Sequence, residues 1–308
     1  MEIADQVMEA LLIMPPDFSD PLDTALLSVS PIIAGPAKVF RGNLDGNLRV
    51  ANLLYLLTFE SVQQQRFNAI FTAERIRLLK AGPSDKGEFP PERLREAMTI
   101  AQKKMKEFAD SPEGHEETIT NTLHALNDLI QRPDLRDSLQ ELVQEAVVMI
   151  WGTFEVFISD SVRSIANASP TKAADLFSGA TKKYLPNPPI SMEKLIEYKF
   201  DLSQSMGDVF FAGTRLDSLP SIKDTLKVLY PNAGALHAIL SNDALWKLWQ
   251  RRNLIVHRRG VVDQPYLSKT GDKVALGERI HLKANYIEEA AKLVRDAAIE
   301  LISTTRTG

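Results

Sequence analysis

Apolar residues recur at helical spacing along most of this chain, and no run of alternating apolar and polar residues indicates a strand. The clearest helix is predicted over 284–303, where the apolar positions are Ile287, Ala290, Ala291, Val294, Ala297, Ala298 and Leu301. A second long helix is predicted over 139–166 with Asp137 or Ser138 as its N-cap, and a third over 47–80, ended by Ala81-Gly82-Pro83. The pattern therefore predicts an all-α protein.

Shorter helices are expected at 2–13, 91–109, 114–131, 171–183, 191–207 and 233–257, with prolines between several of them. The polar stretch Gln131-Arg132-Pro133-Asp134 precedes the long helix at 139 and marks the expected domain boundary. We therefore predict an N-terminal helical region over 1–135 and a helical domain over 136–308. Because the linker is short, we expect two packed halves.

Composition narrows the class of protein. The chain has 308 residues and no cysteine, which excludes disulfides, Cys-ligated zinc and thiol catalysis. Its start lacks a basic region followed by a long apolar core, so no secretion signal is expected. The longest apolar-rich run, 146–158, is too short to span a bilayer and contains Glu155. These features predict a soluble, cytoplasmic protein that does not bind membranes.

Charge is distributed unevenly. Residues 1–135 carry 14 Lys and Arg against 20 Asp and Glu, a net of −6, whereas residues 136–308 carry 22 against 20, a net of +2. The bulk charge is thus not that of a strongly basic nucleic-acid-binding domain. Locally, five cations and no acid fall within thirteen residues: Lys247, Arg251, Arg252, Arg258 and Arg259. Cations also suit the C-terminal end of a helix, so a solvated helix end is the alternative interpretation of Arg258 and Arg259.

The segment 249–260 carries the most informative residues of the chain. Asn253 and His257 are four residues apart on one line of the predicted helix, with Trp246 and Gln250, so the amide is expected to orient the imidazole. Gly260 follows where a helix would stop, which places His257 in an accessible last turn. A histidine moves protons near neutral pH, and an arginine stabilises charge on a phosphate. Together they suffice for RNA cleavage without a metal.

Arg252 falls on the apolar stripe of the same helix, with Leu245, Leu248, Trp249, Ile255 and Val256. A cation in that position needs a partner or must reach solvent. Glu155 lies at the centre of an apolar stripe on the helix at 139–166 and needs a donor. We therefore expect a contact between Glu155 and Arg252, with a structural role, a catalytic role or both.

Other chemistries find no support in the sequence. His115 lies in a charged turn without a second histidine at metal-ligand spacing, and His124, His237 and His281 are isolated. No glycine-rich phosphate loop and no Gly-x-Ser-x-Gly turn is present. We therefore expect no metal and no cofactor.

The six residues Arg252-Asn253-Leu254-Ile255-Val256-His257 resemble the hallmark of the HEPN superfamily, in which an Arg and a polar residue precede a His at the end of a helix. The following run 258–267 looks like the RiboL-PSP-HEPN and MAE-type branches, and Trp151 to Ile158 resembles the first long helix of those domains. The similarity covers roughly 136–305. It implies a HEPN-type bundle of four to five core helices with an additional N-terminal helical region.

The resemblance implies a metal-independent endoribonuclease that works as a homodimer with a composite site. In that mechanism His257 acts as general base or acid, Arg252 stabilises the phosphorane and Asn253 orients both. Arg251, Arg258 and Arg259 would bind flanking RNA phosphates. The family also implies a toxin or antiphage-defence role with an antitoxin or regulatory protein as partner, and residues 1–135 are a candidate regulatory or sensing element.

Two other functions remain compatible with the sequence. One is a non-catalytic HEPN module that binds RNA or a nucleotide. The other is a helical interaction or structural protein in which the Arg and His spacing is a coincidence. An intact Arg252 and His257 favour the enzyme over the non-catalytic module.

Overall fold

The computed structural model describes residues 2–13, 15, 17–80, 90–177, 181, 183–184, 190–211 and 216–307. These residues form fifteen helices and no β-strand, which confirms the all-α class. The only strand-like pairing among them is an isolated antiparallel bridge between Val261 and Arg279. Whether the helices form a HEPN-type bundle stays a prediction.

The chain divides into two compact units. The first comprises Met1–Ile13 and Asn52–Leu139, and the second comprises Met14–Ala51 and Gln140–Gly308. This division differs from the expected 1–135 and 136–308, because the segment 14–51 packs with the C-terminal half. The boundary at 139/140 also falls inside a continuous helix, α7 (Pro133–Ala168), and not in a linker.

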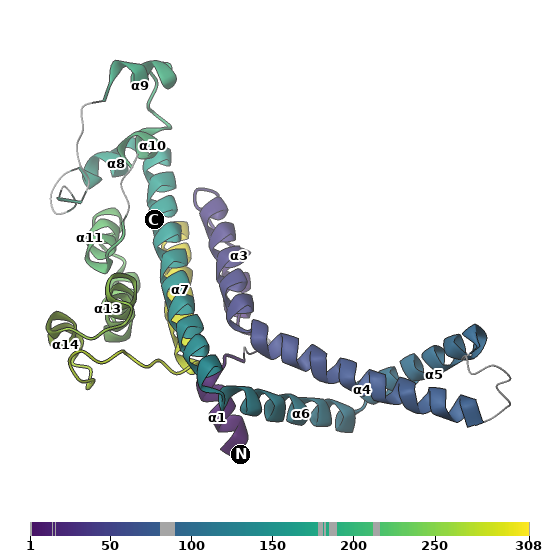
Figure 1. Ribbon diagram of the computed structural model, residues 1–308. Coiled ribbons are helices and arrows are strands. Elements are labelled where there is room, and N and C mark those ends of the chain that lie inside the picture. Colours follow the sequence, from purple (N-terminus) through teal and green to yellow (C-terminus); the bar gives the residue numbers. More distant parts are fainter. Residues whose placement is uncertain are drawn as a thin grey trace. The chain divides into compact units, whose positions relative to one another are not determined.

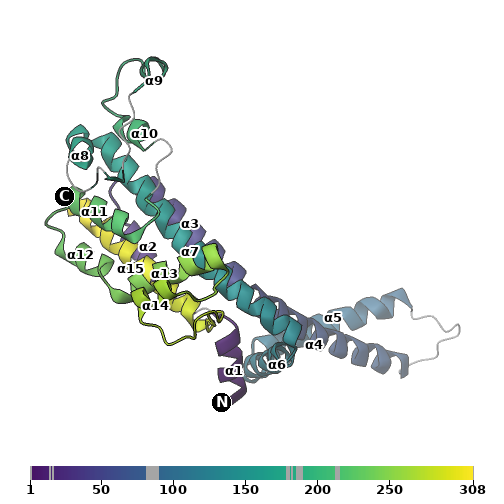
Figure 2. The ribbon, with the colours of Figure 1, turned by 60° about the vertical axis from the view of Figure 1, so that its left-hand side comes forward.

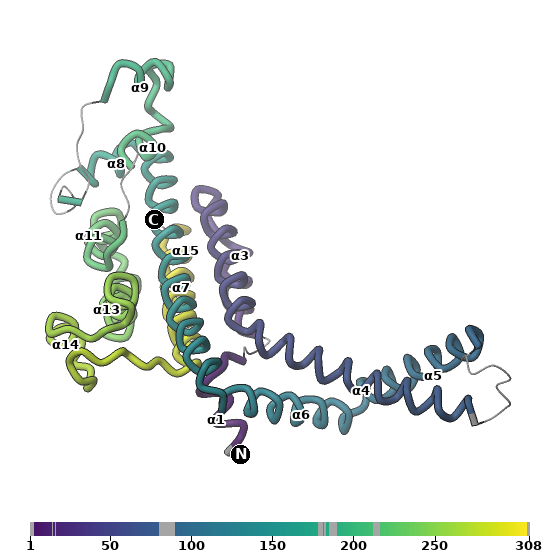
Figure 3. The backbone as a smooth tube through the Cα atoms, in the orientation of Figure 1, coloured from purple at the N-terminus to yellow at the C-terminus, as the bar shows by residue number. Residues whose placement is uncertain are grey.

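The first unit is built from α1 (Glu2–Ala10), α4 (Leu53–Lys80), α5 (Pro91–Ala109), α6 (Pro112–Ile130) and the first turns of α7 (Figure 3). Helix α4 packs on α5 and α6, and α1 packs on α6. Its core contains Val7, Leu11, Leu126, Ile130 and Leu139, all at most 7% exposed. The amphipathic pattern thus predicted α1, α5 and α6 to within a few residues.

The second unit is built around the remainder of α7 and around α15 (Asn285–Thr307). These two helices run alongside each other (Figures 1 and 2). Helix α3 (Ala34–Ala51) also packs on α7, where the Phe40 and Phe157 rings lie 4.8 Å apart. The other helices are α2 (Asp20–Leu26), α8 (Pro170–Leu176), α9 (Met192–Glu197), α10 (Met206–Phe210), α11 (Leu219–Leu229), α12 (Gly234–Leu240), α13 (Asp243–Arg258) and α14 (Gln264–Thr270). This unit carries every residue of the candidate site.

Several predicted boundaries were wrong. The N-cap of the long helix is neither Asp137 nor Ser138, because α7 begins at Pro133, and the Ser138 hydroxyl donates to the Asp134 carbonyl within it (2.9 Å). The segment 47–80 contains the end of α3 and all of α4, and 233–257 contains α12 and α13. Helices α2, α11 and α14 were not predicted, nor was α3 before residue 47. The expected stop at 81–83 lies outside the described residues.

Among the described helices, α7 is long and apolar enough to cross a membrane by length and composition alone. Trp151, Phe154 and Ile158 of this helix are fully buried in the second unit. The core helix of a soluble protein has the same character, so α7 gives only weak support for a membrane span.

Candidate active site

Helix α13 has a defined start and a defined stop. At its start the Asn242 side chain accepts a hydrogen bond from the Ala244 amide (2.8 Å). At its end Arg259 adopts the left-handed conformation, and the Gly260 amide donates to the Leu254 carbonyl (3.1 Å), as in a Schellman-type cap. His257 is exposed in the last turn, which confirms the position predicted from Gly260.

Gly260 is required by both backbone conformation and space. Its φ of +77° is unfavourable for side chains other than hydrogen. A Cβ atom there would lie 3.2 Å from the Ile280 Cγ2 atom and 3.3 Å from the Gln144 amide. The Gly260 carbonyl accepts from the Ile280 amide (2.8 Å), and the Gln144 Nε2 donates to the Ile280 carbonyl (3.1 Å). The end of α13 is therefore fixed against α7 and the segment before α15.

The predicted contact between Glu155 and Arg252 is present. The Arg252 Nη2 donates to Glu155 Oε2 at 3.3 Å, and the two side chains are 20% and 15% exposed. The other carboxylate oxygen of Glu155 accepts from the indole Nε1 of Trp151 at 2.5 Å. Glu155 thus joins α7 to α13 and holds the Arg252 guanidinium in place. Its structural role is visible here, while a catalytic one stays a prediction.

Asn253 contacts one of its two expected neighbours, Arg252, and not the other, His257. Its Oδ1 accepts from Arg252 Nη1 at 3.0 Å, so the amide helps to orient the guanidinium. Within the described part of the chain no hydrogen bond joins Asn253 to His257, nor Arg252 to His257. One copy of the chain thus positions Arg252 firmly and leaves the imidazole on the surface.

A small pocket lies beside His257. Its volume is about 170 Å³, and α13, α14 and the turn between them line it with Gln250, Asn253, Leu254, His257, Arg258, Asp263, Pro265, Tyr266 and Lys269. Asn253 and His257 come from one face of α13, and Gln250 precedes His257 by two helical turns on the same face. The pocket therefore places the predicted histidine beside two amides and two longer cations.

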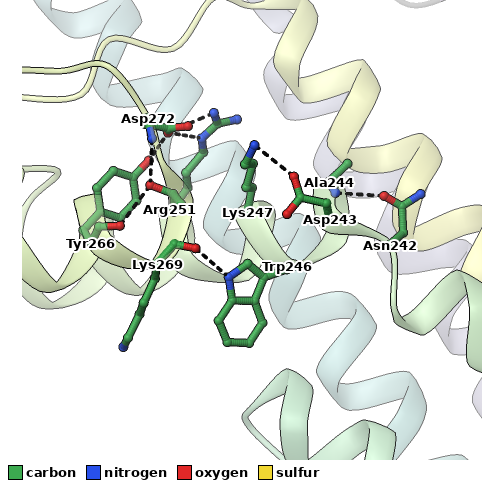
Figure 4. A network of polar contacts seen from close by, with 10 residues as sticks. Asn242, Asp243, Ala244, Trp246, Lys247, Arg251, Tyr266, Lys269 and Asp272 are labelled. Carbon is green, nitrogen blue, oxygen red and sulfur yellow. Dashed lines mark hydrogen bonds and ion pairs between the residues drawn. The ribbon is translucent and has the colours of Figure 1, made fainter.

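Arg251 belongs to a network of polar contacts, and its side chain is 20% exposed (Figure 4). Its guanidinium donates to Asp272 at 3.0 Å and lies 4.6 Å from the centre of the Tyr286 ring. The Tyr266 hydroxyl donates to the same carboxylate at 2.5 Å. These contacts join α13, α14 and α15, and the expected role of Arg251 in binding phosphate stays a prediction.

The electrostatics of this network agree with its geometry. Burial alone lowers the pKa of Arg251, but the interactions with Tyr286, Tyr266 and Asp272 outweigh it, so the pKa lies above its ordinary value. Burial, followed by the bond to Asp272, raises the pKa of Tyr266. The arginine therefore stays charged and the tyrosine stays neutral at any physiological pH.

Arg258 and Arg259 remain available at the surface. Arg258 forms an ion pair with Asp263 (2.9 Å), but its side chain is 58% exposed and lines the pocket. Arg259 is exposed, and its carbonyl accepts from Arg279 (2.9 Å). An exposed ion pair is worth little, so Arg258 can exchange Asp263 for a phosphate at small cost. Their expected role in RNA binding stays a prediction.

Sequence reasoning missed two contributors to this site. Gln250 was placed on the line of Asn253 and His257, but no role was assigned to it. Lys269 comes from α14, a short helix whose Asp263 cap and Pro265 were available as signals. Comparison with protein-family models, with curated protein sequences and with solved structures gave no significant match for this chain.

Proposed function

We propose that this protein is a metal-independent endoribonuclease whose catalytic groups are Arg252, Asn253 and His257. The observation that carries the proposal is that α13 holds one catalytic candidate, Arg252, in fixed contacts and leaves the other, His257, exposed. The guanidinium of Arg252 is held by Glu155 and Asn253, whereas the imidazole of His257 is exposed in a pocket that Arg258 and Lys269 also line. A fixed cation and an accessible proton carrier are the groups that phosphodiester cleavage requires.

In the proposed reaction His257 takes the proton of a ribose 2′-hydroxyl. The 2′-oxygen bonds to phosphorus while the bond from phosphorus to the 5′-oxygen breaks, and an imidazolium returns a proton to the leaving oxygen. Arg252 has five N–H donors and uses two nitrogens for Asn253 and Glu155, so further donors serve the phosphorane oxygens. The products are a 2′,3′-cyclic phosphate and a 5′-hydroxyl.

A homodimer fits the absence of any hydrogen bond between Arg252 and His257 in the described chain. We propose that the motifs of two copies face each other across the RNA and together supply the base, the acid and the two guanidinium groups. A cytoplasmic toxin or antiphage-defence role, with an inhibitory partner, follows from the resemblance to HEPN nucleases and is part of the same proposal.

The test is incubation of purified protein with mixed RNA in excess EDTA. The variants are His257→Ala and Arg252→Ala, with His281→Ala as a control because His281 is an exposed histidine of the same unit. We expect wild type and the control to produce fragments with 2′,3′-cyclic phosphate ends. His257→Ala should lower the rate at least a hundredfold, the usual contribution of an acid or base. DNA of the same sequence should remain intact, because it lacks the 2′-hydroxyl.

The outcomes separate the three candidate functions. Cleavage that survives in both site variants, or that disappears with EDTA, contradicts the proposal. Salt-sensitive RNA binding without cleavage identifies a non-catalytic module. The absence of both RNA binding and RNA cleavage identifies an interaction or structural protein.

A further inference from the structure

We infer that the pocket beside His257 receives one nucleobase of the RNA, next to the cleaved bond, and that Gln250 reads the edge of that base. This inference deepens the proposed nuclease function and rests on it for the identity of the ligand. Its independent basis is the state of Gln250, which the cleavage mechanism does not use.

Gln250 is a buried amide without a hydrogen-bond partner. The side chain is only 5% exposed, and its Nε2 atom is buried with no partner among the described residues. Burial of an unpaired donor costs about 1–3 kcal/mol, which a hydrogen bond to a ligand would recover. Because Gln250 also lines the pocket, a rotation of its amide would turn this donor toward a ligand there, which can supply the missing acceptor.

The rest of the lining suits a base better than a phosphate. Leu254, Pro265 and the ring of Tyr266 provide apolar walls, and Asp263 adds a carboxylate that would repel a phosphate. Asn and Gln side chains are common readers of base edges, because an amide carries a donor and an acceptor side by side. The cations Arg258 and Lys269 are then available for the sugar-phosphate backbone.

The size of the pocket and its position relative to His257 also favour a nucleobase as its ligand. The pocket volume of about 170 Å³ is below the roughly 300–1,000 Å³ typical of sites for larger ligands, so it has room for one planar ring system. Gln250 and His257 lie seven residues apart on α13, which corresponds to about 10 Å along the helix axis. A base at Gln250 would thus leave its own phosphate near His257. Gln250 is accordingly a specificity residue and not a member of the proton-transfer machinery.

The test compares binding and cleavage in wild type, Gln250→Met and Gln264→Ala. Methionine keeps the volume of glutamine and removes the amide, and Gln264 is an exposed glutamine outside the pocket. Titrations with the four nucleoside 3′-monophosphates and with inorganic phosphate measure selectivity without any cleavage. We expect wild type and Gln264→Ala to bind one nucleotide at least tenfold more tightly than the others. Gln250→Met should reduce that preference to less than threefold and leave phosphate binding unchanged.

The second measurement maps the cleavage ends on a random RNA pool. Wild type should cleave next to the nucleotide that it binds most tightly, and Gln250→Met should lose this preference. Selective binding without cleavage would refute the nuclease and support the base pocket. Cleavage without any preference, or a preference that persists in Gln250→Met, would refute the base pocket and leave the nuclease intact. Equal binding of all four nucleotides and phosphate would identify an anion site and overturn the inference. If Gln250→Met does not fold, Gln250→Glu replaces it, and a changed base preference is then expected.

Discussion

Removal of the Glu155 carboxylate is the sharpest structural perturbation of the candidate site. Glu155 is 15% exposed, and its contacts include the Trp151 indole at 2.5 Å and the Arg252 guanidinium at 3.3 Å. The Glu155→Ala substitution removes the acceptor of the buried indole N–H and the carboxylate partner of Arg252. We therefore expect the variant to lose both stability and activity.

The magnitude follows from the two contacts taken separately. Loss of a hydrogen bond to a charged acceptor costs about 1.5–3 kcal/mol, and the indole of Trp151 is fully buried. The ion pair with Arg252 is long and partly exposed, so solvent screening limits its contribution to about 1 kcal/mol or less. For a unit of this size each kcal/mol lowers Tm by about 2–4 °C, which predicts a fall of roughly 5–15 °C. Glu155→Gln keeps an acceptor for Trp151 and should lower Tm by less than about 5 °C.

Thermal unfolding followed by circular dichroism gives Tm, and the indole N–H signals in a nitrogen-proton correlation spectrum report the contact directly. The chain has three tryptophans, so the Trp151 signal can be assigned by substitution. Glu145→Ala is the control, since Glu145 is an exposed glutamate on the same helix. A Tm within 2 °C of wild type together with an unchanged Trp151 signal would show that the carboxylate does not hold this site together.

Three further predictions concern parts of the chain outside that contact. Gly260→Ala should destabilise the protein by about 2 kcal/mol or more in urea unfolding. Gly271→Ala is the control and should cost about 1 kcal/mol, because Gly271 has a φ of +67° but an added Cβ would meet no atom within 4 Å. Equal costs would mean that the contacts around Gly260 do not affect stability. Hydrogen bonds from Lys104 and then Arg77 lower the pKa of Glu74 below its ordinary value of 4.5. The ionised Glu74 carboxylate therefore stabilises the fold above that pH, and this stabilisation is lost as the pH falls through the lower pKa of the folded state. The stability of the first unit should accordingly fall less steeply with falling pH in Glu74→Gln than in wild type. Identical dependence of stability on pH in the two proteins would contradict this. Gln250→Met should raise the free energy of unfolding by about 1 kcal/mol, because it removes a buried unpaired amide, and a decrease would indicate that the amide has a partner within the fold.

Local sequence determined much of the helical architecture. Apolar residues at spacings of three and four predicted α15 and most of α7, because each of those helices buries one continuous stripe. Gly260 predicted the end of α13 and the exposed His257, although the left-handed residue that caps the helix is Arg259, directly before the glycine. Even the contact between Glu155 and Arg252 followed from the sequence, since two charges on apolar stripes of different helices need each other.

Tertiary structure decided the rest. On α13 the sequence pattern placed Val256 toward the core, yet Val256 is 46% exposed and Leu254 is 5% exposed, because the actual neighbours determine which face is buried. Packing also gave Arg251 its partners, since Asp272, Tyr266 and Tyr286 approach it only after α14 and α15 have packed. Residues 14–51 join the second unit although they precede the first unit's main segment, because packing on α7 is not encoded by position along the chain. The spacing of an arginine and a histidine is a property of one helix, whereas a pocket, and the amide of Gln250 that it leaves unpaired, exists only where several segments meet.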